Sequence, residues 1–297
     1  MNAIQTERVC GSSLEEHQAA LKILLEAFAD VCQEYDIPYL LYAGTMLGAV
    51  RHQGFIPWDD DVDVIMPREG YERFLKIAPE ALDAEKFFVQ GEYSDHWPMF
   101  FSKLRLNDTA CMEKYIPKDS NMHQGIYIDI FPYDNLSDSR IERWIQFFAS
   151  KLVIAAGLQK RGHATGNKWK KLAMKMGGLF PVPLVHAVHT YVQKRGKNYT
   201  QCVHTFFAAA SAYHKNVFPR AWLEETAMMP FEGRDYPVSA YYDQMLTTVY
   251  GDYLTLPSEE NRKCKQHNFL VDVHHSYMEY LGYQENQKIE VYYESIR

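Results

Sequence analysis

The chain of 297 residues carries a net charge of −7, with 47% hydrophobic and 14% aromatic residues. This length can bury a full core, and the composition excludes an intrinsically disordered protein. The negative charge argues against general nucleic-acid binding, and no apolar run reaches the length of a membrane-spanning helix.

The cysteines and the N-terminal residues indicate a compartment. Five cysteines are an odd number, and no two of them form a CxxC pair, which is typical of reduced thiols. Residues 1–17 contain no apolar signal region. We therefore expect a cytoplasmic protein.

Helical and strand patterns alternate in the first half of the chain. Ser13 stands three residues before Glu16, a capping-box signature, and apolar residues follow at helical spacing. The elements expected as far as residue 131 are a helix over 13–35, a strand over 39–42, a tight turn at Gly44, a helix over 45–52, a turn at Gly54 and Pro57, a strand over 61–66, a helix over 68–82, and strands of the same sheet over 87–90, 100–106 and 125–131.

The second half has mainly helical spacing. Helices are expected from residue 141 to about 154, over 184–213, over 241–250 and over 263–280. The fold class is therefore α/β, with a mixed (α+β) sheet. A shift in charge near 138–140 divides the chain into a core over 1–137, a basic helical insertion over 138–205, and a C-terminal helical part over 206–297 that completes the core.

An acidic run enters the strand expected over 61–66. Because side chains alternate along a strand, Asp59, Asp61 and Asp63 would share one face. Carboxylates this close repel one another unless they are protonated or neutralised by a cation, and hard oxygen ligands of this kind suit Mg²⁺. Charge runs are usually solvated loops, but Val62 and Val64 interleave this one, which favours a metal site on Asp61 and Asp63.

A further carboxylate lies in the apolar strand expected over 125–131. Asp129 is the lone charge of that strand, and a buried Asp without a partner is costly, so it needs a cation or hydrogen bonds. We expect Asp129 to complete the metal site or to act as a base. The alternative is a structural Asp at the end of the strand. Asp134, beyond Pro132, is the expected turn residue.

Groups that could bind phosphate lie near the acidic run. Backbone N–H groups at Gly44 and Thr45, between a strand and a helix, can hold a phosphate with help from the Thr45 hydroxyl. Arg51, His52 and Lys103 could neutralise phosphate charge or form ordinary ion pairs. Trp58 could stack on a base or a cation, or simply belong to the core.

The stretch from Tyr42 to Val64, YAGTMLGAVRHQGFIPWDDDVDV, resembles the signature of the LicD family, which is related to fukutin and fukutin-related protein. The stretches Pro230–Gly233, Tyr250–Asp252 and Leu256–His267 are similar to that family as well. The resemblance implies a polymerase-β-like nucleotidyltransferase core, with Gly44 and Thr45 on phosphate and Asp61 and Asp63 on metal.

The resemblance also implies a reaction and its partners. A phospho-alcohol such as phosphocholine would move from a CDP-activated donor to a sugar of a cell-surface glycan, such as lipopolysaccharide or teichoic acid, or to its lipid-linked precursor. Two alternatives remain open. One is a nucleotidyltransferase that releases pyrophosphate from an NTP, and the other is a non-catalytic glycan-binding protein.

A basic segment stands apart from this site. Residues 140–200 hold 12 Lys or Arg and one Glu, a net charge of +11, so the remaining residues carry −18. Apolar clusters accompany these charges, a combination that interfacial helices use on anionic lipid. Peripheral contact with an anionic membrane, docking of the acceptor glycan and plain packing against the acidic core are the three roles that the segment could have.

Overall fold

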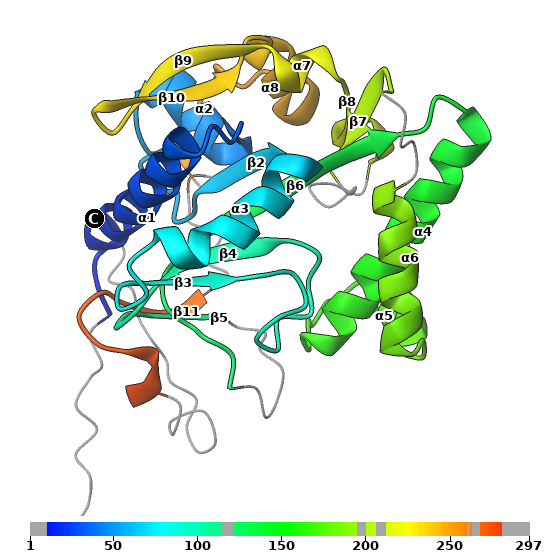
Figure 1. The fold of residues 1–297 in the computed structure, drawn as a ribbon, viewed down its shortest axis with the longest axis horizontal. Helices are drawn as coiled ribbons and strands as arrows, with labels where there is room; N and C mark the ends of the chain where they lie inside the picture. Colours follow the sequence, from blue (N-terminus) through cyan, green and yellow to red (C-terminus); the bar gives the residue numbers. More distant parts are fainter. Residues whose placement is uncertain are drawn as a thin grey trace, which may run out of the picture.

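A computed structural model of the chain describes residues 11–113, 121–194, 200–205, 212–259, 262 and 268–280. Its centre is a mixed seven-stranded sheet (Figure 1). The strand order is β1-β2-β6-β4-β3, and β7 pairs with β6 and β8. Only the β2–β6 pair is parallel in this sheet. The strands are β1 (Leu40–Leu41), β2 (Asp63–Pro67), β3 (Phe87–Gln90), β4 (Ser102–Leu106), β6 (Tyr127–Leu136), β7 (Cys202–His204) and β8 (Val217–Pro219).

Helices and two small antiparallel sheets surround this centre. The helices are α1 (Leu14–Glu34), α2 (Ala43–His52), α3 (Arg68–Ala81), α4 (Arg140–Lys160), α5 (Lys168–Gly177), α6 (Val182–Lys194), α7 (Ala221–Glu224), α8 (Tyr242–Tyr250) and the short 3₁₀ turns η1 (Tyr213–Asn216) and η3 (Tyr277–Glu279). The two-stranded sheets are β9 (Thr226–Phe231) with β10 (Arg234–Ser239), and β5 (Ala110–Glu113) with β11 (Asn268–Asp272). The mixed α/β class expected from the sequence is confirmed.

The elements of the first half follow local sequence signals. Ser13 caps α1, and the expected capping box is present: the Ser13 N–H donates to Glu16 Oε2 at 2.7 Å, and the Glu16 N–H donates to Ser13 Oγ at 3.2 Å. The strands expected over 87–90, 100–106 and 125–131 lie in one sheet, as predicted. The main apolar core packs α1, α2 and α3 against the central strands, with Leu21, Phe28 and Phe74 among its fully buried side chains.

Two predicted helices are wrong in part. Helix α6 ends at Lys194, and residues 202–204 form β7 instead of continuing a helix to 213. Residues 268–272 form β11 where a helix over 263–280 was expected, and 263–267 lie outside the described residues. The C-terminal part is therefore not mainly helical, because it contributes β8 to β11 besides α7 and α8. These strands are short and depend on distant partners, which local spacing does not reveal.

The expected turn at Asp134 is also wrong. Strand β6 continues to Leu136, and Asp134 is buried within it. Its carboxylate accepts two hydrogen bonds from Arg68, Nε to Oδ1 and Nη2 to Oδ2, both at 2.8 Å. A bidentate pair of this kind supplies the charge partner that a buried carboxylate needs.

Helices α4, α5 and α6 form an arm, residues 140–194, which stands to one side of the sheet (Figure 1). A second apolar cluster joins the arm to the core: Val153, Ala156, Val185 and Val192 of the arm pack with Trp97, Met99, Phe100, Phe101 and Met122. Within the part of the chain that the structure describes, no helix combines the length and apolar character needed to cross a bilayer.

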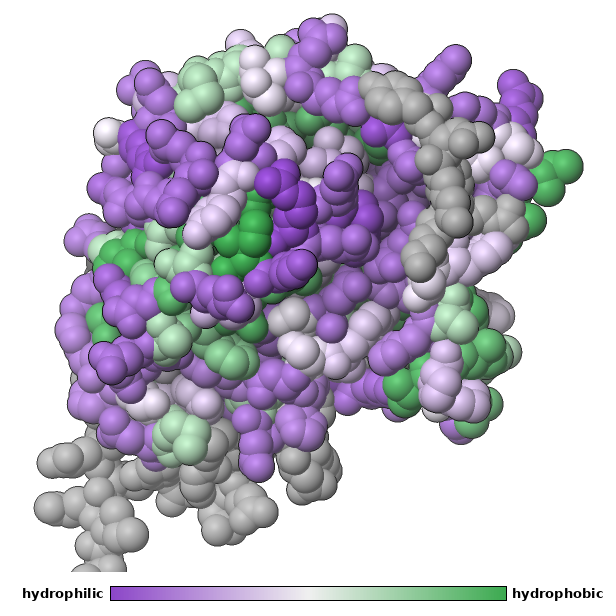
Figure 2. All heavy atoms as spheres, in the orientation of Figure 1, coloured by the Kyte–Doolittle hydropathy of each residue, from purple (hydrophilic) through white to green (hydrophobic). Residues whose placement is uncertain are grey.

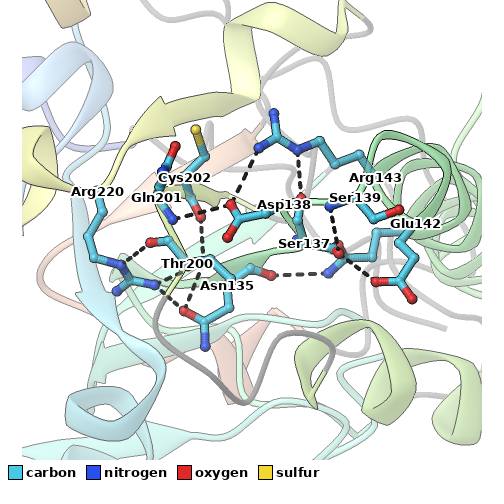
Figure 3. Close-up of polar contacts among 11 residues, drawn as sticks. Asn135, Ser137, Asp138, Ser139, Glu142, Arg143, Thr200, Gln201, Cys202 and Arg220 are labelled. Carbon is cyan, nitrogen blue, oxygen red and sulfur yellow. Dashed lines mark hydrogen bonds and ion pairs between the residues drawn. The ribbon is translucent and has the colours of Figure 1, made fainter.

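At the end of β6, polar contacts join the residues that precede the arm to residues that follow it (Figure 3). The Gln201 N–H donates to Asp138 Oδ1 at 3.4 Å, and Arg143 donates to the Ser137 carbonyl oxygen at 2.6 Å. Arg220 donates to the Thr200 carbonyl oxygen at 2.7 Å and also contacts the Asn135 side chain. The arm therefore leaves the sheet and returns to it at one fixed place.

Candidate active site

Three charged residues lie side by side across the central sheet. In the β2–β6 pair Asp63 is opposite Asp129, and in the β6–β4 pair Asp129 is opposite Lys103. Neighbouring strands are about 4.8 Å apart, so this register forms a row of charged groups. Two segments far apart in the sequence, the acidic run and the apolar strand with its lone Asp, thus meet as predicted.

The acidic run reaches this row as an extended loop rather than as a strand. Strand β2 begins at Asp63, two residues later than expected, so Asp59 and Asp61 precede it. The Thr45 hydroxyl, at the start of α2, accepts a hydrogen bond from the Asp63 N–H at 2.8 Å. Gln18 of α1 donates to the Asp59 carbonyl oxygen at 2.9 Å. Both contacts fix the backbone of the loop.

Helix α2 begins earlier than expected and touches the acidic run directly. Gly44 lies in the first turn of α2, and the tight turn expected at Gly44 is made by Ala43, with φ +47°. A Cβ atom on Gly44 would stand 2.8 Å from Asp59 Oδ2. Only glycine therefore allows the Asp59 carboxylate to approach the N-terminus of α2 so closely, where the helix dipole favours negative charge.

Burial and mutual repulsion act on the four carboxylates of Asp59, Asp61, Asp63 and Asp129, which we call the acidic centre. Burial raises the pKa of Asp61 well above its ordinary value, and Asp59, Asp60 and Asp129 raise it further. Burial likewise raises the pKa of Asp63, with Asp61, Asp129 and Asp59 adding to the effect. The four side chains remain half-buried rather than sealed. A ligand can therefore reach them.

Lys103 is the ammonium group next to the acidic centre. Its Nζ lies 2.8 Å from Asp129 Oδ1 and 3.2 Å from Glu113 Oε1, and its side chain is almost fully buried. The Nζ also stands 3.2 Å from the centroid of the Tyr127 ring. Lys103 thus lies between two carboxylates. Its charge lowers the pKa of Asp61 and Asp63 less than burial and the other carboxylates raise it.

The donor set of the acidic centre fits a hard divalent cation. Carboxylate oxygens that repel one another at a solvent-accessible edge are stabilised by such an ion. Over the described ranges no three His, Cys, Asp or Glu side chains form a ready-made metal cage. One or two carboxylates, together with water and substrate oxygens, would hold the ion, and Mg²⁺ is usually bound in this way. Asp61, Asp63 and Asp129 are the residues among which these one or two carboxylates would be found.

The remaining predicted residues form a separate basic and aromatic group at the other end of α2. Arg51 donates to His52 Nε2 at 3.0 Å and to the Tyr253 carbonyl oxygen at 2.8 Å. The His52 ring meets the Trp58 ring edge-on at 6.5 Å, and the Arg262 guanidinium lies 5.8 Å from the Trp58 ring centroid. Eight residues of helix separate Gly44 from His52, a distance of about 12 Å.

Sequence reasoning missed several residues that the structure places at the site. Glu113 bridges Lys103 and Arg161. Burial raises the pKa of Tyr250, and Asp63 raises it further, so the phenol lies beside the acidic centre. Glu113, Arg161 and Tyr250 are far from the acidic run in the sequence. Only the stretch that begins with Tyr250, which resembles the LicD family, indicated one of them.

Two comparisons with known proteins both find a similarity to the LicD family. The profile of the family described as LicD/FKTN/FKRP, nucleotidyltransferase domain, matches residues 36–152, which include Gly44, the acidic centre and Lys103. The lipopolysaccharide cholinephosphotransferase LicD of Haemophilus influenzae is 27% identical over 276 residues, covering 84% of this chain and 95% of that protein.

Two shorter matches are uncharacterized proteins of Rickettsia. The protein of Rickettsia typhi is 38% identical over 66 residues, which are 22% of this chain and 21% of that protein. The protein of Rickettsia prowazekii is 39% identical over 57 residues, which are 19% of this chain and 21% of that protein. Because both proteins are uncharacterized, these two matches give no information on activity.

Proposed function

We propose, since the chain belongs to the LicD family, that it transfers phosphocholine or a related phospho-alcohol from a CDP-activated donor to a cell-surface glycan or its precursor. The observation that carries the proposal is the acidic centre, in which β2 and β6 bring Asp63 and Asp129 together. Support also comes from the likeness to a lipopolysaccharide cholinephosphotransferase along most of both chains.

The proposed roles follow from the contacts of each residue. Asp61, Asp63 and Asp129 would hold Mg²⁺, which when bound neutralises charge on the donor diphosphate. The first turn of α2 at Gly44 and Thr45 offers backbone N–H groups to phosphate oxygens. The Thr45 hydroxyl positions the backbone of Asp63 at 2.8 Å. Lys103 fixes the carboxylate of Asp129 beside Asp63.

The basic and aromatic group is the proposed site for the rest of the donor. Trp58 lies near both His52 and Arg262 and directly precedes the acidic run. Its ring could stack on the base, while Arg51 and Arg262 face anionic groups. Substrate positioning and charge neutralisation carry most of the catalysis of phosphoryl transfer, so residues that only bind can account for the rate.

The proposal extends to the core itself. We infer a polymerase-β-like nucleotidyltransferase core over 1–137, completed by 206–297 and interrupted by the segment 138–205. The match of residues 36–152 to a family described as a nucleotidyltransferase domain supports the nucleotidyltransferase part of this inference. The arm then belongs to the inserted segment, and its two ends are held together at β6.

A donor screen tests the proposal. CDP-choline, CDP-ethanolamine, CDP-ribitol and CDP-glycerol are each incubated with the protein and a glycan acceptor, and release of CMP is measured with and without Mg²⁺. We expect Mg²⁺-dependent CMP from one of these donors. Pyrophosphate from an NTP would indicate a nucleotidyltransferase instead. Neither product, with no thermal shift on adding Mg²⁺ and CDP-choline, would leave a glycan-binding protein.

A further inference from the structure

Large apolar side chains are exposed mainly on the arm. Of the 19 exposed large hydrophobic residues in the described part of the chain, 12 lie between residues 141 and 191. They are Ile141, Trp144, Ile145, Phe148, Trp169, Leu172, Met176, Leu179, Phe180, Val182, Leu184 and Tyr191. Single exposed apolar residues need no explanation, but a concentration on one structural unit indicates an interaction surface.

Small residues lie at two close contacts of the arm, one between α4 and α5 and one between α4 and the core. A Cβ atom on Gly177 of α5 would stand 2.8 Å from the Ala156 backbone nitrogen of α4, so the two helices meet through small residues. A Cβ atom on Gly157 would stand 2.9 Å from the Pro98 carbonyl oxygen of the core. The α4–α5 contact therefore brings the two backbones close together, while many large apolar side chains of the arm stay exposed. The large side chains are left for contact with something else.

Helix α5 shows the pattern most clearly. Trp169, Leu172 and Met176 recur at helical spacing and are 80%, 48% and 55% exposed. A basic stripe of Lys168, Lys171 and Lys175 runs beside them. The exposed Leu179 continues the apolar stripe into the turn before α6. Figure 2 shows hydrophobic side chains gathered over this part of the arm, at the lower right.

After Glu142, every charged residue of the arm is basic. No Asp or Glu occurs between Glu142 and the end of the arm, whereas α5 alone has four lysines in ten residues. The rest of the molecule is strongly acidic, as the charge division at residue 140 shows. An anionic surface would therefore attract the arm and repel the remainder, which orients the molecule.

We propose that the exposed face of α5 and the α5–α6 turn docks on an anionic lipid surface. The Trp, Leu and Met side chains would enter the interface, and the lysines beside them would meet lipid headgroups. The cations of α5 are all lysines, which are depleted at protein–protein interfaces and common on interfacial helices. A lipid surface therefore fits this face better than a second protein does.

Docking through the arm would also position the acidic centre. Asp129 lies in β6, the strand that directly precedes the arm, and Arg143 of α4 donates to the Ser137 carbonyl oxygen just after that strand (Figure 3). The length and direction of the arm would thus set the distance between the lipid surface and the acidic centre. The docking itself does not depend on the proposed transferase activity.

Co-sedimentation of the full chain with vesicles tests the docking. Vesicles of phosphatidylcholine alone are compared with vesicles that also contain phosphatidylglycerol, at low and at high salt. We expect binding only to the mixed vesicles, with a sharp loss as salt rises, because exposed charges are screened. Failure to bind the mixed vesicles at low salt overturns the proposal.

Two pairs of lysine substitutions distinguish binding through the face of α5 from an effect of the net charge of the protein. Lys168→Glu with Lys171→Glu should weaken binding at least about tenfold. The matched control is Lys76→Glu with Lys86→Glu, which changes the net charge equally at two exposed lysines outside the arm. The control should keep its binding. Equal loss in both pairs would contradict docking through α5.

A third variant tests the apolar contribution. Trp169→Ser with Leu172→Ser leaves the charge unchanged and should still weaken binding, because less apolar surface enters the lipid. Both side chains are exposed, so circular dichroism and thermal unfolding should match the parent. Sedimentation velocity adds the decisive alternative: a dimer that this variant abolishes would assign the face to a second copy of the chain.

Discussion

At the scale of single residues, the site is a balance between charges that repel and charges that pair. Burial raises the pKa of Asp61 and of Asp63, and the charges of Asp59 and Asp129 raise both pKa values further. At the other end of the row, the almost fully buried Lys103 pairs with Asp129 and Glu113. Removing an aspartate and removing the lysine should therefore have opposite effects on stability.

Asp61→Asn and Asp63→Asn should each reduce transfer at least about a hundredfold, because each removes a carboxylate charge that would hold the proposed Mg²⁺ beside the phosphates. Without Mg²⁺ the melting temperature should stay the same or rise, since one repelling carboxylate is gone. CMP release and thermal unfolding measure the two effects. Asp235→Asn, at an exposed position on β10, is the control. Activity of either site variant within tenfold of the parent would refute the assignment.

Lys103→Met should destabilise the fold by about 3–5 kcal/mol, because it leaves buried Glu113 and half-buried Asp129 without this ammonium group. Adding Glu113→Gln should recover part of that loss, since Glu113 is then neutral. Urea denaturation of the two single variants and the double variant completes the cycle. Costs that simply add would show that the two groups do not interact.

At the scale of elements, α2 makes two close approaches with different neighbours. A Cβ atom on Gly48 would stand 2.5 Å from the Gly54 carbonyl oxygen, which is backbone. A Cβ atom on Gly44 would meet the carboxylate of Asp59, the end of a side chain that can rotate. The same substitution should therefore affect stability at one position and activity at the other.

Gly48→Ala should lower the free energy of unfolding by about 1–3 kcal/mol, because the helix and the turn must separate. Gly44→Ala should change it little, since alanine favours a helix and only a carboxylate moves. Its CMP release should nevertheless fall more than tenfold. Denaturation midpoints and rates are compared between the two variants. Full activity in Gly44→Ala would show that the position of the Asp59 carboxylate is irrelevant.

The elements that could be predicted from the sequence are those with a local signal. The capping box of Ser13 and Glu16 and the spacing after it predicted α1, and the apolar spacing from Ile141 predicted the start of α4. Strands β7 and β11 were mistaken for helix, because their three and five residues become strands only beside β6 and β5. Tertiary context overrides local preference in such short segments.

Some residues of the candidate site also carry a local sequence signal, and others do not. The acidic run could be found because its residues are contiguous, and Asp129 because a lone charge in an apolar strand demands a partner. Its partner could not be identified, since Lys103 is only one of many cations in the sequence. Arg161 of the arm contacts Glu113 only because the fold brings them together, and no local spacing predicts that contact.

At the scale of the whole molecule, buried histidines should make stability depend on pH. Burial lowers the pKa of His123 and His189 to about 3 and that of His204 to about 4. His123 also accepts the Gly125 N–H on Nδ1 at 3.0 Å, a contact that protonation of Nδ1 would break. The unfolded chain takes up these protons near pH 6.5, whereas the folded chain resists until about pH 4.

The folded state should therefore lose stability as pH falls from about 6.5 to 4, by up to about 1.4 kcal/mol per pH unit for each histidine. The raised pKa values of Asp59, Asp61 and Asp63 act in the opposite direction, so the test compares slopes. Urea denaturation at several pH values should give a smaller slope for His123→Gln than for the parent. Identical slopes would mean that His123 titrates alike in both states.

The arm leaves the sheet at Ser137 and rejoins it at Cys202, and the contacts that close its base lie in those few residues and in Arg220. Changes of length within α4, α5 or α6 therefore shift no strand register. A relative's arm could be grafted between the same two points, provided that it still covers the apolar cluster around Trp97 and Phe100. The surface that the arm contacts could then change through one continuous segment, while β2 and β6, which carry Asp63 and Asp129, stay unchanged.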